Sequence, residues 1–154
     1  MTKKNMKIIN KHINREYLIL DKFEAGISLT GSEVKSIRQG RISFVGAFVK
    51  FVSGSPVLVG AQIFPYQFNG NLDYDDKRTR KLLLHKKEIL RLTNRLSERP
   101  NLTIVPVSCY TKGSLIKLEI ALVQGKKTWE KKKTEKNKAE TRRVEKEIKE
   151  ELKG

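Results

Sequence analysis

Short apolar runs separated by turn residues occupy most of the chain, and they predict a protein built mainly of β-strands. These β-prone runs cover residues 6–9, 17–20, 23–29, 44–52, 57–64, 102–110 and 115–123. Two of the gaps between runs, Ser53–Pro56 and Thr111–Ser114, contain a glycine and predict hairpin turns. The chain therefore has at least two predicted hairpins among its strands.

The segment 30–40 carries a complete set of helix signals. Thr30 and Glu33 have the T-x-x-E spacing of a capping box, in which each side chain accepts from the other's backbone N–H. Val34 and Ile37 fall on one face, which we expect to meet the core. Gly40 suits the left-handed conformation that commonly ends a helix.

A second helical pattern, rich in leucine, covers residues 81–96, and the polar stretch 65–79 before it predicts a loop. Strands therefore lie on both sides of two helices. Many short strands with glycine-bearing turns favour a small closed barrel. The predicted fold class is mainly β, an OB-like closed barrel with two flanking helices, and a split α+β sheet is the alternative.

The composition changes near residue 125, which divides the chain into a body, 1–124, and a charged tail, 125–154. Lys and Arg number 33 against 17 acidic residues, a formal charge of +16. Residues 126–154 contain twelve basic and seven acidic side chains, a net +5, which leaves +11 on the body. Such an excess favours a polyanionic partner, either nucleic acid or an anionic membrane surface. The tail has few apolar residues, so we expect it to be disordered when free.

Several function classes find no support in the sequence. No apolar run approaches the roughly 20 residues that span a bilayer, and Cys109 is a lone cysteine, so we expect a soluble protein in a reducing compartment. Asp73, Asp75 and Asp76 lack the glycine and distal glutamate of a calcium loop and predict a solvated loop. Because no group of residues supports catalysis, we expect a protein that is not an enzyme and needs no metal or cofactor.

Basic side chains gather at both predicted helices. Lys35 and Arg38 share one face of the first helix, and Arg41 lies just beyond it. A solvated surface is the alternative, but the charge of the body favours a nucleic-acid face whose affinity falls steeply with salt.

A second basic cluster precedes and begins the second helix. Its members are Arg78, Arg80, Lys81, Lys86 and Lys87. Tyr66 offers a planar surface on which a base could stack, or else packs beside a loop at the edge of the barrel. Trp129 also has two possible roles. It either anchors the tail on the body or stacks on a nucleobase.

Several motifs follow one another in a fixed order. They are NK at 10–11, FEAGI at 23–27, GSEVKSIRQG at 31–40, PY at 65–66, RTRKLLLHK at 78–86 and GKK at 125–127. Together they resemble the small protein B family, the SsrA-binding proteins of bacterial trans-translation, over nearly the whole chain. The last motif adds Lys126 and Lys127 to the candidate RNA-binding residues.

The resemblance implies an OB-fold barrel that binds the tRNA-like domain of transfer-messenger RNA, one protein per RNA, and carries it into stalled ribosomes in the cytoplasm, with no membrane partner. It also implies that Asn10, Lys11, Glu33, Lys35 and Arg38 lie on the RNA-binding side. Since a carboxylate repels phosphate, Glu33 would accept from a base or a ribose hydroxyl, or cap the helix, or both. The tail would enter the vacant mRNA channel, become helical and replace the codon–anticodon pair in the small-subunit decoding centre.

The chain departs from the family pattern in two places. After GKK the family usually has Tyr or His and then Asp-Lys-Arg, where this chain has Trp129, Glu130, Lys131 and Lys132. Stacking and charge are kept, but Lys132 lacks the planar fork with which arginine grips a phosphate. The loop before the second helix retains only Asp75 of the family's Asn-His-Asp-Pro. The alternative function is a ribosomal protein or an initiation-type factor with an OB barrel.

Overall fold

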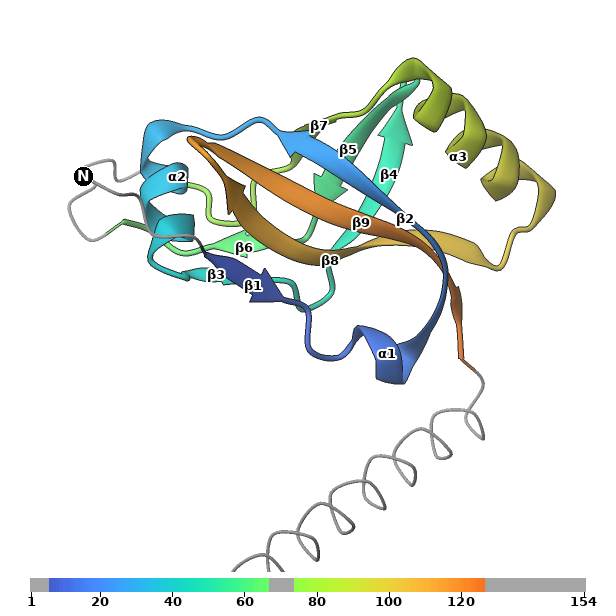
Figure 1. The fold of residues 1–154 in the computed structure, drawn as a ribbon, viewed down its shortest axis with the longest axis horizontal. Coiled ribbons are helices and arrows are strands. Elements are labelled where there is room, and N and C mark those ends of the chain that lie inside the picture. The colour runs from blue at the N-terminus through green and yellow to red at the C-terminus, as the bar shows by residue number, and fades with distance from the viewer. Residues whose placement is uncertain (1–5, 67–73, 127–154) are drawn as a thin grey trace, which may run out of the picture.

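A computed structural model describes residues 6–66 and 74–126 of the chain (Figure 1). Its elements, in order, are β1 (Lys7–Ile9), α1 (Ile13–Glu16), β2 (Tyr17–Ile27), α2 (Gly31–Arg38), β3 (Ile42–Ser43), β4 (Phe48–Val52), β5 (Ser55–Val59), β6 (Gln62–Ile63), β7 (Arg80–Leu83), α3 (Lys86–Glu98), β8 (Leu102–Lys112) and β9 (Leu115–Gly125). The predicted mainly-β class is confirmed. The described residues form three helices rather than the two predicted, because the short α1 was not foreseen.

Hydrogen bonds between antiparallel strands close a ring of six. The ring runs β8–β4–β5–β7–β2–β9, and β9 pairs back onto β8. The junction of β4 with β8 rests on one pair, Val49 with Ile104, whereas β2, β8 and β9 pair over most of their length. Strand β1 adds to the free edge of β8, and β3 and β6 form a separate two-stranded sheet. The long strands β2, β8 and β9 therefore carry the framework.

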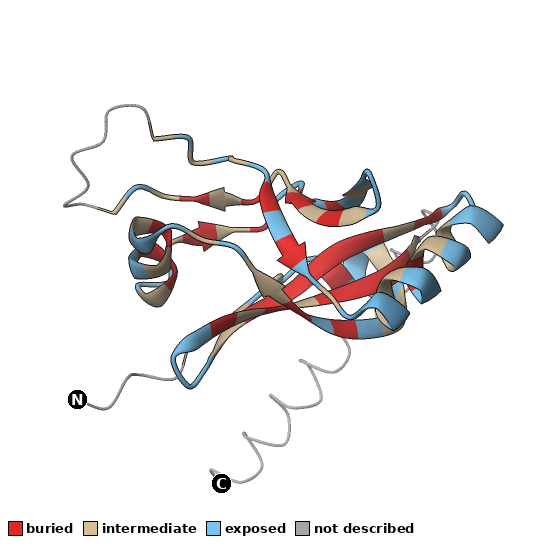
Figure 2. Ribbon diagram, turned by 90° about the horizontal axis from the view of Figure 1, so that it is seen from above, coloured by how far each residue is buried: buried red, intermediate tan, exposed pale blue. Residues whose placement is uncertain are grey.

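The main core lies inside the ring and is covered at one end by α2. Figure 2 shows the buried residues concentrated on the central strands. Ile37 of α2 has no exposed surface and packs there with Leu58, Ile104 and Leu118, while Val34 packs partly buried against them. The predicted core face of the first helix is thus confirmed.

A smaller core occupies the outer face of β8 and β9. Ile13 of α1 packs there with Val105, Val107, Ala121 and Val123. This second core explains why most of β8 and the end of β9 are buried on both faces. A strand with one solvated face would instead alternate between buried and exposed residues.

The capping box of α2 forms as predicted. The Glu33 N–H donates to Thr30 Oγ1 at 3.3 Å, and the Thr30 N–H donates to Glu33 Oε1 at 2.9 Å. Gly40 follows the helix with φ of 75°, and its N–H donates to the Ile37 carbonyl at 2.8 Å. Side-chain hydrogen bonds of the capping box therefore fix the start of this helix, and the backbone conformation of Gly40 ends it.

Both predicted hairpins are present, with tighter turns than expected. Strands β8 and β9 are longer than the predicted runs, whereas β4 and β5 are shorter than the predicted runs 44–52 and 57–64. Between β4 and β5 the turn is Ser53 and Gly54, with φ of 49° and 78°, the positive pair of a two-residue turn that matches the twist of the strands. Ser55 and Pro56 consequently belong to β5. The strands predicted at 17–20 and 23–29 are a single strand, β2, with an irregularity in its register after Ile19.

The predicted helix over 81–96 is wrong at its beginning. Arg80 to Leu83 form β7, which pairs with β2 and β5, and α3 starts only at Lys86. The side chains alternate along β7, since Arg80 and Leu82 are buried and their neighbours are exposed. The His85 N–H then donates to Glu88 Oε1 at 3.1 Å, which favours a helix start at this point.

Some predictions fall on residues that the structure does not describe. They concern Asp73 of the predicted loop and, in the tail, Lys127, Trp129, Glu130, Lys131 and Lys132. Strand β9 ends at Gly125, close to the predicted division between body and tail. None of the helices in the described ranges is long and apolar enough to cross a membrane.

Candidate nucleic-acid interface

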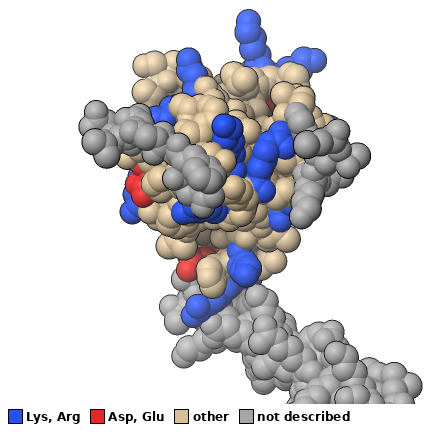
Figure 3. All heavy atoms as spheres, turned by 90° about the vertical axis from the view of Figure 1, so that its left-hand side faces the viewer, with Lys and Arg blue, Asp and Glu red and all other residues tan. Residues whose placement is uncertain are grey.

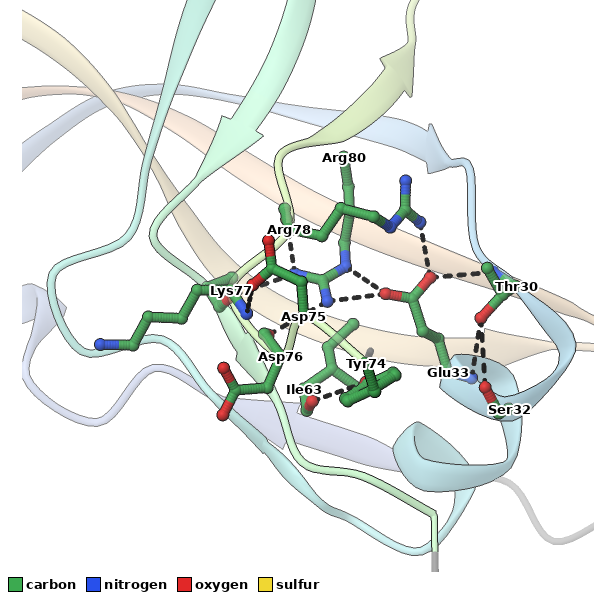
Figure 4. Close-up of polar contacts among 11 residues, drawn as sticks. Thr30, Ser32, Glu33, Ile63, Tyr74, Asp75, Asp76, Lys77, Arg78 and Arg80 are labelled. Atoms are coloured by element: carbon green, nitrogen blue, oxygen red, sulfur yellow. Dashed lines mark hydrogen bonds and ion pairs between the residues drawn. The ribbon is translucent and has the colours of Figure 1, made fainter. Parts of the chain in front are cut away.

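Glu33, in the first turn of α2, is a buried carboxylate surrounded by hydrogen-bond donors (Figure 4). Only 1% of it is exposed. In addition to the Thr30 N–H, Oε1 accepts from Arg78 Nη2 at 2.6 Å. Oε2 accepts from Arg80 Nε at 2.7 Å and lies 2.6 Å from Arg80 Nη2. Both carboxylate oxygens are therefore engaged inside the protein.

Arg80 of β7 is the other buried charge, with no exposed surface. Besides Glu33, its guanidinium reaches three backbone carbonyls. Nη1 donates to the Ala61 carbonyl at 2.9 Å and to the Arg78 carbonyl at 2.8 Å, and Nη2 donates to the Asp76 carbonyl at 3.1 Å. One side chain thus ties α2 to the segment that joins β6 to β7.

The electrostatics of Glu33 follow from these contacts. Burial by itself raises the pKa of a carboxyl, but hydrogen bonds from Arg78, the Thr30 backbone and Arg80 outweigh that effect. The pKa of Glu33 therefore lies below its ordinary value, and the group is ionised at neutral pH. One carboxylate balances one of the two guanidinium charges, and the second positive charge is left over.

Basic side chains lie on α2 and on the segments that follow it and precede β7, and together with Tyr66 we call them the α2–β7 patch. Its members are Lys35, Arg38, Arg41, Tyr66 and Arg78. Figure 3 views this end of the molecule and shows Lys and Arg side chains spread across it with few acidic ones. Lys35 Nζ lies 5.4 Å from the centroid of the half-buried Tyr66 ring, and Arg38 Nη2 donates to the Ser114 carbonyl at 3.2 Å. Arg78 is 41% exposed although it pairs with Glu33.

Three other candidate residues lie around α1. The Asn10 side chain donates to a backbone carbonyl of β8 at 2.9 Å, and Lys11 beside it is exposed. Lys126, just after β9, donates its backbone N–H to the Glu16 carbonyl at 2.9 Å and its Nζ to the Asn14 carbonyl at 2.6 Å. The end of β9 is therefore fastened to α1.

Lys81 and Lys86 belong to a third region. Lys81 points outward from β7, and Lys86 is the first residue of α3; both are exposed. Because α2 and α3 lie at opposite sides of the ring, the structure does not bring Lys86 to the α2–β7 patch (Figures 1 and 2). Those predicted site residues that lie within 6–66 and 74–126 thus occupy three regions: the α2–β7 patch with its buried pair, the surroundings of α1, and the β7–α3 junction.

Sequence reasoning missed the inward orientation of Arg80. The available signal was the alternation of Arg78, Arg80 and Leu82, which is the period of a strand with one buried face. The assignment of residues 81–96 to a helix concealed that period.

Two aspartates of the acidic loop accept hydrogen bonds within the protein, and Cys109 is buried. Asp76 Oδ2 accepts from the Gln62 side chain at 2.7 Å, and Asp75 Oδ1 accepts from the Lys77 N–H at 3.1 Å. Among the residues described, no three His, Cys, Asp or Glu side chains are grouped so that they could hold a metal ion. Burial raises the pKa of Cys109 to about 12, so it stays a thiol at neutral pH.

A family model described as SmpB protein matches residues 7–150 of the chain. The chain belongs to the SmpB family. The SsrA-binding protein of Sulfurihydrogenibium sp. (strain YO3AOP1) is 45% identical to this SmpB-family chain over 144 residues, which cover 94% of each protein. The SsrA-binding protein of Carboxydothermus hydrogenoformans is 40% identical over 137 residues, 89% of this chain and 91% of the relative.

This SmpB-family chain is also similar to solved structures. One described as "tmRNA-SmpB: a journey to the center of the bacterial ribosome" is 38% identical, with a TM-score of 0.66, and covers 79% of this chain and 85% of the matched chain. The resemblance inferred from the sequence motifs is therefore confirmed.

Proposed function

We propose that this SmpB-family protein is a non-enzymatic RNA-binding adaptor of trans-translation. It binds the tRNA-like domain of transfer-messenger RNA and delivers it to stalled ribosomes in the cytoplasm, one protein per RNA. The observation that carries this proposal is the match to the SmpB family over residues 7–150, together with relatives named SsrA-binding proteins at 40–45% identity. The ring of six strands would be the family's OB-fold barrel.

The body would hold the RNA through its exposed basic side chains. Lys35, Arg38 and Arg78 of the α2–β7 patch are placed to reach phosphates, and Tyr66 offers a ring on which a base could stack. We propose secondary contacts from the other candidates, Asn10, Lys11, Lys81, Lys86, Lys126 and Lys127. Glu33 and Arg80 are buried, so their part in RNA binding would be exerted from inside the protein.

The tail would act on the ribosome rather than on the tRNA-like domain. Its net charge of +5 suits a channel lined with phosphate. We propose that it enters the vacant mRNA channel and becomes helical there. The decoding-centre contacts would come from Trp129, Glu130, Lys131 and Lys132.

A binding titration tests the function of the body. The full-length protein is titrated against the tRNA-like domain and against a ribosomal RNA fragment of equal length, at several salt concentrations. A clear preference for the tRNA-like domain is expected, whereas a ribosomal protein would prefer the ribosomal fragment. Equal or reversed preference would refute the proposal.

Paired variants test where the RNA binds. Lys35→Ala with Arg38→Ala removes two candidate phosphate contacts, each worth about fivefold in affinity at 0.15 M salt if each releases about 0.9 counterion. The double variant should therefore bind the tRNA-like domain about 25-fold more weakly, with a salt slope shallower by about two. Lys50→Ala, which removes an exposed lysine from β4, is the matched control and should bind almost like the wild type.

A further inference from the structure

Glu33 and Arg80 lie beneath the α2–β7 patch rather than on it. We propose that they are positioning residues, which fix the guanidinium of Arg78 at the surface in the orientation that receives an RNA phosphate. This inference rests on the proposed function, and it assigns to the buried pair a role different from direct contact with RNA.

The buried pair holds Arg78 at two points. Its side chain donates through Nη2 to Glu33 Oε1 at 2.6 Å, and its backbone carbonyl accepts from Arg80 Nη1 at 2.8 Å. The side chain nevertheless remains 41% exposed. An arginine held in this way has already lost much of its rotamer freedom, so less conformational entropy is lost when a phosphate binds.

The backbone that carries Arg78 is fixed by the same cluster. The Asp76 carbonyl accepts from Arg80 Nη2 at 3.1 Å and from the Ile63 N–H at 2.9 Å, and its carboxylate accepts from the Gln62 side chain at 2.7 Å. The segment before β7 is thereby fastened to β6 from the inside. A guanidinium on this segment projects from a well-supported backbone, which favours precise phosphate recognition.

Direct contact of Glu33 with RNA does not fit the geometry. Its oxygens already accept from Thr30, Arg78 and Arg80, and only 1% of the residue is exposed. The charges are also arranged for an indirect role. Arg80 is buried against the carboxylate, so the unbalanced positive charge of the cluster is the one that Arg78 carries at the surface.

A double-mutant cycle on RNA affinity separates the two roles. Glu33→Gln keeps an oxygen that can accept from the Thr30 N–H but loses the charge that holds both arginines. Glu33→Gln and Arg78→Ala should each weaken binding to the tRNA-like domain about fivefold at 0.15 M salt and lower the salt slope by about one. The double variant should bind no more weakly than Arg78→Ala alone. If the two single losses multiply, Glu33 acts independently of Arg78 and the inference fails.

Asp21→Asn provides the matched control. Asp21 Oδ2 also lies near two arginines, Arg91 at 3.0 Å and Arg95 at 3.5 Å, but it faces α3. The substitution changes the net charge by the same amount as Glu33→Gln, so a general charge effect would appear in both. Affinity within twofold of the wild type is expected for Asp21→Asn, and an equal loss in both variants would overturn the inference.

Arg78→Lys keeps the test decisive should Glu33→Gln fail to fold, because Arg78 is partly exposed and its replacement spares the buried pair. Lysine preserves the charge but not the fork that binds Glu33 and a phosphate together. Binding as weak as that of Arg78→Ala supports positioning, and binding equal to the wild type overturns it. A wild-type protein without preference for the tRNA-like domain would refute the proposed function, whereas the cycle, run on whichever RNA binds, still tests the coupling.

Discussion

Replacing Glu33 by glutamine should destabilise the fold far more than a surface substitution does. Removing one partner of a buried ion pair costs about 3–5 kcal/mol, because the other charge stays buried without compensation. Of the two arginines that Glu33 holds, Arg78 can turn toward water, but Arg80 has no exposed surface. The three carbonyls that accept from Arg80 remain, so we expect the lower end of that range, about 3 kcal/mol.

The assay is urea unfolding of the full-length protein, followed by circular dichroism, at neutral pH. A loss of 3 kcal/mol should also lower Tm by about 12 °C, at about 4 °C per kcal/mol for a domain of this size. Asp21→Asn is the comparison, since Asp21 is 25% exposed and its partners Arg91 and Arg95 are 61% and 38% exposed. That variant should lose less than about 1 kcal/mol. A Glu33→Gln loss as small as this would refute the argument from burial.

Three further predictions concern the pH dependence of the Glu33 contribution, the glycine between β5 and β6, and the tail. The pKa of Glu33 lies below its ordinary value of 4.5, so its contribution to stability is present above pH 4.5 and is lost as the pH falls further. The difference in free energy of unfolding between the wild type and Glu33→Gln should therefore shrink when urea unfolding is repeated at acid pH. A difference that stays constant would contradict this. Gly60 has φ of 82°, and a Cβ there would lie 3.0 Å from the Gly46 carbonyl oxygen, whereas a Cβ at Gly40 would meet nothing within 4 Å. Gly40→Ala should therefore cost only the roughly 1–2 kcal/mol of a positive φ, and Gly60→Ala should cost more. Equal losses of stability in urea unfolding would count against the contact with Gly46. Truncation after Lys127 keeps both bonds of Lys126 to α1 and every candidate RNA contact of the body. It should leave binding to the tRNA-like domain within about twofold by filter binding but stop tagging on stalled ribosomes. Retained tagging would rule out the proposed tail mechanism.

Features encoded by neighbouring residues could be predicted from the sequence. The capping box of α2 depends on Thr30 and Glu33, three positions apart, and the turn between β4 and β5 depends on Ser53 and Gly54. In each case the physical cause lies within one turn of chain, so the pattern alone is sufficient. The same holds for the core face of α2, which follows from helical spacing.

Features that depend on distant partners could not be predicted in this way. The segment 80–83 is a strand because β2 and β5 supply its hydrogen bonds. Its leucines suit a strand and the start of a helix equally well, and the alternation of Arg80 and Leu82 is too short a pattern to decide between them. The site has the same character, since Glu33 is 45 residues from Arg78 and 47 from Arg80. Charge composition indicated a nucleic-acid face, but only the folded chain separates the exposed arginine from the buried one.

The central claim is tested most directly by the RNA that accompanies the protein in cells. The full-length protein is recovered from bacterial lysate at low salt, and the co-purified RNA is sequenced and compared with total RNA. Transfer-messenger RNA should be strongly enriched over ribosomal RNA, and a wash at high salt should release it. Recovery of ribosomal RNA alone, or of no specific RNA, would contradict the account.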